Sequence, residues 1–206
     1  MIETSLIRIE DWLIINAENI SKHSLQKPAT DIQLHELENR IGKDLPQDFK
    51  QLYKWHNGMN DIKNVGSLFY GMDFMPIKTI ISDHENRIRV LEKIKLNKVD
   101  KEIDASNIFN PFWIQFGFDG ARTGLYIDLS PTPDGNYGQI IFIDDEYSVG
   151  IFIARSVTEF IDSFQIDLEN GLYSLDIDAM EDHNHFLVAD QSIDIINWEH
   201  SKRWKR

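Results

Sequence analysis

Apolar residues in the first part of the chain recur three and four positions apart, which is the spacing along one face of an α-helix. The clearest series is Ile2, Leu6, Ile9 and Leu13. It predicts a first helix over residues 3–18. Thr30 and Gln33 have the spacing of a capping box and predict the start of a second helix, which Gly42 ends.

Two further helices are predicted to begin at prolines, which are favoured in the first turn of a helix. The first follows Pro46 and stops at Gly58, a residue that tolerates positive φ. The second follows Pro76, and its apolar face extends to Leu91. His84 lies on that face, so we interpret it as a packing residue rather than a ligand.

After residue 111 the pattern changes to that of β-strands. Short apolar runs, alternating or nearly continuous, are typical of strands in a sheet. These runs are 112–117, 124–129, 139–144 and 149–154. An aromatic-rich stretch at 65–75 predicts a further strand, whereas the charged stretch 95–111 is interpreted as a loop.

A last long helix follows these strands. Ser156 and Glu159 repeat the capping-box spacing, and Gly171 closes the helix. Helices, then adjacent strands, then a helix predict an α+β fold with a mostly antiparallel or mixed sheet packed against several helices. We assign residues 1–175 to a single domain. Residues 176–206 are acidic and then basic, and we interpret them as a C-terminal extension.

Composition and charge narrow the function. The 206 residues include no Cys, which excludes disulfides, thiolate catalysis and cysteine-bound metals. The net charge is −13. Four of the last five residues are basic, namely Lys202, Arg203, Lys205 and Arg206, so the residues before them carry a still larger negative charge. Such a chain repels phosphate backbones, so we expect a basic protein partner and no nucleic acid. No apolar run reaches the ~20 residues of a membrane span, which predicts a cytoplasmic protein.

The motifs that suggest a metal or catalytic site lack the residue spacing that such a site requires. His183-Asn184-His185 cannot gather metal ligands, because consecutive side chains point apart. Asp176 and Asp178 have calcium-like spacing, but the loop lacks the glycine and the distal glutamate of an EF-hand. No nucleotide-binding or nucleophile motif is present. We therefore expect no catalytic residues, no metal and no cofactor.

Aromatic and polar residues in the predicted turns are the candidate partner-binding residues, because such side chains are enriched at protein interfaces. They are Trp55, His56, Asn57, Asp119, Arg122, Asp128, Asp134, Tyr137, Asp144 and Asp145. Trp113, in contrast, is interpreted as a core residue. Exposed aromatics are also compatible with a homodimer.

Several blocks together resemble a known family. They are Leu45-Pro46-x-Asp48-Phe49-x-x-Leu52-Tyr53-x-x-His56-Asn57-Gly58, Trp113-Ile114-x-Phe116-Gly117-x-Asp119-Gly120, Leu125-Tyr126-Ile127-Asp128-Leu129-x-Pro131, Gly138-Gln139-Ile140-Ile141 and Asp167-Leu168-Glu169-x-Gly171-Leu172-Tyr173. Over residues 3–175 they resemble the Smi/Knr family of cell-wall assembly (glucan synthesis) regulators, in the SUKH superfamily. Gln115, where proline is expected, and Arg122, where a small or amide residue is usual, depart from the family pattern.

The resemblance implies a SUKH-like α+β fold and no enzymatic activity. It also implies two roles, because bacterial members of the family neutralise toxins and fungal members are scaffolds in cell-wall signalling. Our main hypothesis is an immunity protein that binds a polymorphic toxin. The alternative is a regulatory scaffold in cell-wall or envelope signalling. A hydrolase using Asp119 and Asp128 is a third hypothesis.

Overall fold

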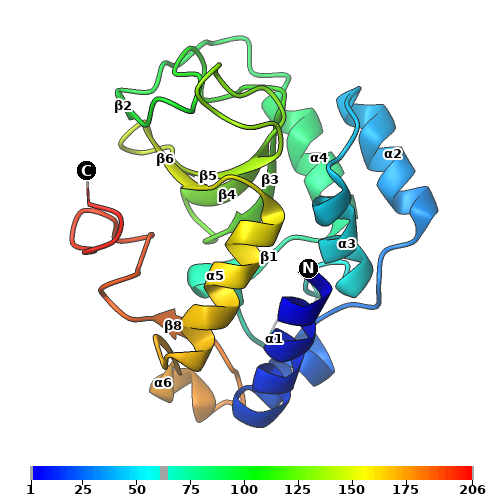
Figure 1. Cartoon of the computed structure of the whole chain (residues 1–206), viewed down its shortest axis with the longest axis vertical. Helices are drawn as coiled ribbons and strands as arrows, with labels where there is room; N and C mark the ends of the chain where they lie inside the picture. Colours follow the sequence, from blue (N-terminus) through cyan, green and yellow to red (C-terminus); the bar gives the residue numbers. More distant parts are fainter. Residues whose placement is uncertain (1, 61–64, 206) are drawn as a thin grey trace.

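The computed structural model describes residues 2–60 and 65–205 (Figure 1). Its α-helices are α1 (Ile2–Asn16), α2 (Asp31–Ile41), α3 (Gln47–Trp55), α4 (Ile77–Arg87), α5 (Val157–Glu169) and the short α6 (Ile177–Met180). The strands are β1 (Asp73–Phe74), β2 (Lys98–Val99), β3 (Trp113–Phe118), β4 (Thr123–Asp128), β5 (Gln139–Asp144), β6 (Val149–Ala154), β7 (Tyr173–Leu175) and β8 (Leu187–Ala189). None of the described helices has the length and apolar content needed to cross a membrane.

The main sheet confirms the α+β prediction. Within the described residues it has six strands in the order β1-β3-β4-β5-β6-β2. Neighbouring strands are antiparallel, except that β2 runs parallel to β6. The strands β3 to β6 agree with the predicted runs to within two residues at each end. A small antiparallel pair, β7 and β8, lies apart from this sheet.

Both faces of the main sheet are buried. On one face Leu125 and Ile127 belong to the large core that α1, α3 and α5 share. On the other face Tyr126 and Ile141 pack with apolar residues of the long connection between α4 and β3. Every residue of β4 and β5 is buried, which explains why the β5 sequence is almost continuously apolar.

Local sequence signals fix the ends of several helices. Thr30 and Gln33 form the predicted reciprocal capping box, and Gly42 adopts φ 72° after α2. The Ser156 side chain accepts a hydrogen bond from the Glu159 backbone at the start of α5. These helices begin and end as predicted because the signals lie within a single turn of the chain.

Two predictions about the middle of the chain are wrong. The stretch 65–75 is not one strand: it contains a 3-10 turn at Phe69–Gly71 and only the two-residue β1. Its aromatic side chains are buried in the core without a continuous ladder, and Tyr70 has φ 54°. The helix after Pro76 ends at Arg87 instead of continuing to Leu91, which is exposed. His84 is buried, and its Nε2 lies 2.8 Å from the Pro111 carbonyl, as suits a packing residue.

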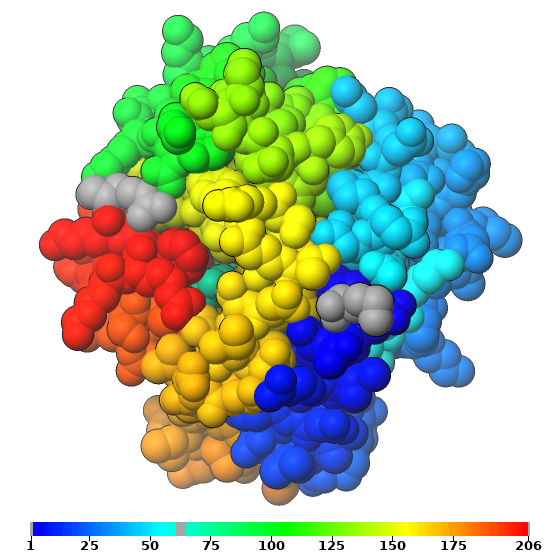
Figure 2. All heavy atoms as spheres, in the orientation of Figure 1, coloured from blue at the N-terminus to red at the C-terminus, as the bar shows by residue number. Residues whose placement is uncertain are grey.

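The C-terminal segment, residues 187–205, packs against the same core as the rest of the chain. Leu187, Ile193, Ile195, Trp198 and Trp204 are all buried members of the large core. Figure 2 shows this segment, in orange and red, lying against the yellow α5. The indole of Trp204 donates to the Ile193 carbonyl at 2.7 Å, and Arg203 pairs with Asp167 of α5. Arg206 lies outside the described residues.

We predict that Trp204→Ala lowers the free energy of unfolding by about 3–5 kcal/mol, because the substitution opens a cavity in the shared core. Urea unfolding followed by circular dichroism measures this loss. The control is Lys205→Ala at the exposed neighbouring position, which should stay within about 0.5 kcal/mol of the parent. Equal stabilities for the two variants would mean that the segment contributes nothing to the core.

Candidate functional site

The structure separates the predicted binding residues into three places. The β3–β4 turn and the β5–β6 turn bring Asp119, Arg122, Asp144 and Asp145 together at one end of the sheet, because Thr123 pairs with Asp144 across β4 and β5. Asp128, Asp134 and Tyr137 lie at the opposite end of those strands. In the third place, Trp55 is the last residue of α3, and His56 and Asn57 follow it.

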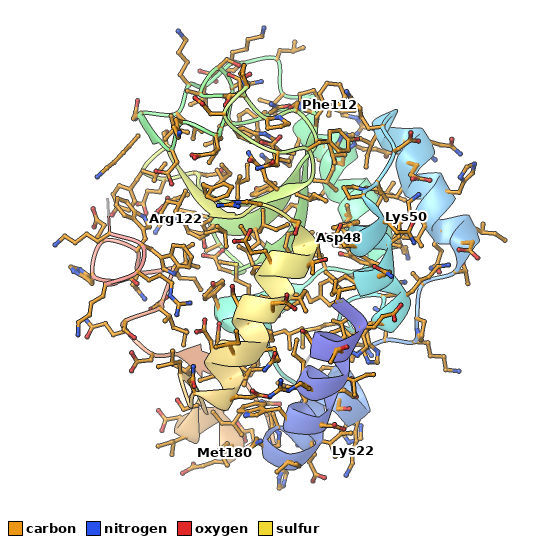
Figure 3. All side chains as sticks on the ribbon, in the orientation of Figure 1. Lys22, Asp48, Lys50, Phe112, Arg122 and Met180 are labelled. Carbon is orange, nitrogen blue, oxygen red and sulfur yellow. The ribbon has the colours of Figure 1, made fainter. Side chains whose placement is uncertain are left out.

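A surface groove of about 350 Å³ lies at the first of these sheet ends. Its charged and titratable lining residues are Asp119, Arg122, Asp144, Glu146, Tyr147, Glu199 and His200. One wall comes from the two turns and the other from the C-terminal segment, and Figure 3 shows Arg122 on the side where these meet. The carboxylates outnumber the cation Arg122, so the groove is acidic.

Asp119 holds the shape of the β3–β4 turn. Its Oδ1 accepts hydrogen bonds from the backbone N–H groups of Ala121, Arg122 and Thr123 at 2.8, 2.9 and 3.0 Å. Gly120, between them, has φ 84°, a conformation that strongly favours glycine. The carboxylate of Asp119 is therefore committed to the turn and is a positioning group more than a contact group.

Asp144 joins the two walls of the groove. Its Oδ1 accepts from the backbone of Glu146 and Tyr147 at 3.0 and 3.1 Å. Its Oδ2 accepts from the indole Nε1 of Trp198, in the C-terminal segment, at 3.0 Å. Because Asp144 is only 3% exposed, its charge serves the fold rather than a partner.

The exposed charges of the groove are those of Arg122, Glu146 and Glu199. Arg122 forms an ion pair with Glu146 across the two turns, as suits its place in a carboxylate-rich groove. The hydroxyl of Thr123 is buried at the groove and has no hydrogen-bond partner among the described residues. Burial raises the pKa of the neighbouring Asp145, and Arg87, 3.9 Å away, partly opposes this effect.

Asp128 is fully buried at the opposite end of the sheet. Its Oδ1 accepts from the Ser130 backbone at 2.8 Å and its Oδ2 from the Gln139 amide at 2.9 Å. Burial raises the pKa of Asp128 from 3.8 to about 6. In the following loop, Tyr137 donates its hydroxyl to the Asp44 carbonyl at 2.6 Å, and the exposed Asp134 lies 3.9 Å from Lys101.

The residues at the end of α3 also serve the fold. The two ring nitrogens of His56 contact the Gln26 carbonyl at 2.6 Å and the Glu10 carboxylate at 3.0 Å. The Asn57 side-chain oxygen accepts from the Ile77 backbone at the start of α4. Trp55 packs edge-on against His56. We therefore place the candidate site at the acidic groove rather than here.

Sequence reasoning missed half of the groove. Glu199, His200 and Trp198 stand more than fifty residues after the turns that they face, and no local pattern links the two stretches. Trp113 is buried, as expected. The departure at Gln115 is accommodated by a β-bulge after it and by Gly124, whose missing side chain leaves room for the Gln115 amide.

The histidine motif and the acidic residues do not form a metal centre in the described part of the chain, where no group of three His, Asp or Glu side chains is arranged to bind an ion. His185 instead accepts a hydrogen bond through Nδ1 from the Asn19 backbone at 3.2 Å.

Together these features define an α+β domain with a mostly antiparallel sheet and an acidic groove where two strand-connecting turns meet the C-terminal segment. A sequence model of the SMI1 / KNR4 family (SUKH-1) matches residues 28–163. The chain belongs to this family, which confirms the resemblance seen in its sequence.

Three relatives show how similar this chain is to known members of the family. The KNR4/SMI1 homolog 2 of Debaryomyces hansenii is 24% identical over 89% of this chain and 39% of its own length. The cell wall assembly regulator SMI1 of Saccharomyces cerevisiae is 24% identical over 78% of this chain and 39% of its own length. The cell wall biosynthesis/cell cycle regulator smi1 of Schizosaccharomyces pombe is 25% identical, over 73% and 33%. The chain spans well under half of each relative. The latter two are named as regulators, not as enzymes.

We predict that Trp198→Phe lowers the free energy of unfolding by about 1.5–3 kcal/mol, because it leaves a buried carboxylate oxygen of Asp144 without its donor. The measurement is urea unfolding at neutral pH. Trp12→Phe is the matched control, since the Trp12 indole makes no hydrogen bond with the described residues and is only partly buried. If both variants lost the same small amount, the contact would not hold the groove walls together.

We predict that Asp128 adds a downward slope to the stability of the protein as pH rises from about 4 to about 6. The folded pKa of Asp128 lies above its ordinary value, so the native state binds the proton more tightly than the unfolded state in this window. Asp128→Asn should flatten this slope in urea unfolding measured at several pH values. Asp134→Asn, in the exposed loop, should leave it unchanged. An unaltered slope in Asp128→Asn would contradict the assignment.

Proposed function

We propose that this chain is a non-enzymatic protein-binding module that regulates cell-wall assembly or glucan synthesis as a scaffold. The observation that carries the proposal is the match to relatives named as cell wall and glucan synthesis regulators. One of these, the glucan synthesis regulatory protein of Neurospora crassa, is 22% identical over the whole chain and 46% of its own length. The toxin-neutralising hypothesis has no corresponding support among these relatives, so the scaffold alternative is preferred.

The acidic groove is the proposed contact site for a partner. Glu199 and Glu146, the latter paired with Arg122, present carboxylates to solvent on its two walls, and the carboxylates of Asp119 and Asp144 hold those walls in place. A lysine or arginine of a partner segment complements these charges, and the buried Thr123 hydroxyl offers an unused hydrogen-bonding group beside them. The net charge of −13 attracts a basic partner over a longer range.

A chimera tests the function directly. The region of Saccharomyces cerevisiae SMI1 that matches this chain is replaced by the chain, and the chimera is expressed in cells lacking the yeast protein. We expect it to restore growth under cell-wall stress and the β-glucan content of the wall. Glu146→Lys combined with Glu199→Lys should reduce this rescue several-fold, because both substitutions reverse charges in the groove.

The control is Asp11→Lys combined with Glu36→Lys, which changes the net charge equally at exposed positions away from the groove. Rescue by the control but not by the groove variant supports the proposed contact site. Equal rescue by both variants would move the site elsewhere on the surface. A folded chimera without any rescue would contradict the regulatory function.

A further inference from the structure

The connection between α4 and β2 exposes an unusual surface. All eight residues at 88–95, here called the basic segment, are exposed. Four of them are large and apolar: Ile88, Val90, Leu91 and Ile94, with Leu91 96% exposed. Burying such residues is favourable, and clusters of them at the surface of soluble proteins mark interaction sites.

The charge of the basic segment is opposite to that of the whole protein. It carries Arg89, Lys93 and Lys95 against the single acid Glu92, in a chain of net charge −13. The flanking cations Arg87 and Lys101 pair with Asp145 and Asp134. In contrast, the three cations of the segment form no ion pair with the described residues. An acidic partner surface with apolar side chains of its own therefore complements the segment.

The chain carries such a surface at α6. Residues 176–182, here called the acidic segment, expose Ile177 and Met180, and Ile177 is 79% exposed. Asp178, Glu181 and Asp182 are exposed beside them. None of these three carboxylates pairs with a cation among the described residues. The two segments thus have opposite charge and similar apolar content.

Their placement prevents the two segments from meeting within one molecule. In Figure 1 the connection from α4 to β2 crosses the top of the view and α6 lies at the bottom, along the longest axis of the molecule. Figure 3 shows Met180 at the same lower end. Surfaces that lie at opposite ends of one molecule can pair with each other only between copies, in a head-to-tail contact.

We propose that this chain self-associates head to tail, with the basic segment of one copy seated on the acidic segment of the next. This contact is distinct from the groove and does not depend on the proposed function. The segments are short, and the contact buries less than the about 1,200 Å² of a standard interface. Association is therefore weak, grows with protein concentration, and weakens at high ionic strength because salt screens the charges.

Sedimentation equilibrium of the full chain, from about 10 µM to about 1 mM, tests the proposal. The parent should rise in average mass above the 24.1 kDa monomer as concentration increases. Lys93→Glu with Lys95→Glu disables the basic segment, and Asp178→Lys with Glu181→Lys disables the acidic segment. Each variant alone should remain at the monomer mass, with an unchanged circular dichroism spectrum and thermal midpoint.

Mixing the two variants is the decisive measurement. Each retains the segment that the other lacks, and their reversed segments repel rather than attract the intact ones. The acidic segment of the first variant can therefore accept the basic segment of the second. The mixture should therefore rise above the monomer mass as the parent does, because the two reversed segments are also opposite in charge to each other. The control is Lys27→Glu with Lys202→Glu, which reverses two exposed lysines outside both segments and should associate like the parent.

Three outcomes would overturn the proposal. The parent could remain monomeric over the whole concentration range. Either single-segment variant could associate like the parent, which would place the contact elsewhere. The mixture could stay monomeric although the parent associates, which would exclude pairing of these two segments.

Discussion

The burial of the central sheet on both faces is the constraint on which the rest of the structure depends. Every residue of β4 and β5 is buried, so neither face can be left to solvent, and the chain must cover both. Helices cover one face. The other is covered by the irregular connection between α4 and β3, through Leu96, Ile103 and Ile108. That connection anchors itself by a few apolar residues and leaves its remaining side chains, including the basic segment, at the surface.

How far the sequence predicts the fold depends on the range of the signal. The capping box at Thr30 and the four main strands were predictable, because each signal lies within a few neighbouring residues. The stretch 65–75 was not predictable, because its aromatic residues pack against α5 and the sheet with strand pairing only at Asp73–Phe74. Burial alone resembles a strand pattern. The end of α4 was missed for the opposite reason. Leu91 continues the helical spacing but is exposed in a connection, so its apolarity does not report burial.

The candidate site was harder to predict from the sequence than the fold. The turn residues Asp119, Arg122 and Asp144 could be selected from the sequence, because turn formers flank apolar runs. The sequence could not show which of these charges are free, because Asp144 accepts a hydrogen bond from Trp198 in a distant part of the chain. The family match ends at residue 163, whereas one wall of the groove comes from residues 196–200. The groove therefore combines a frame inside the matched region with a wall outside it.

The packing of α1 along α5 has a consequence for how the chain is made in the cell. Ser5 donates a hydrogen bond to Asp162 at 2.6 Å, and Arg8 pairs with Glu169, so α1 finds its partner helix only about 150 residues later. At a synthesis rate of about 5–20 residues per second, on the order of ten seconds pass between the synthesis of α1 and that of α5. During this interval Ile9 and Leu13, which are fully buried in the native protein, have only part of their native cover, because α3 is already made but α5 is not. The nascent chain is thus open to chaperones or to wrong contacts until α5 emerges from the ribosome.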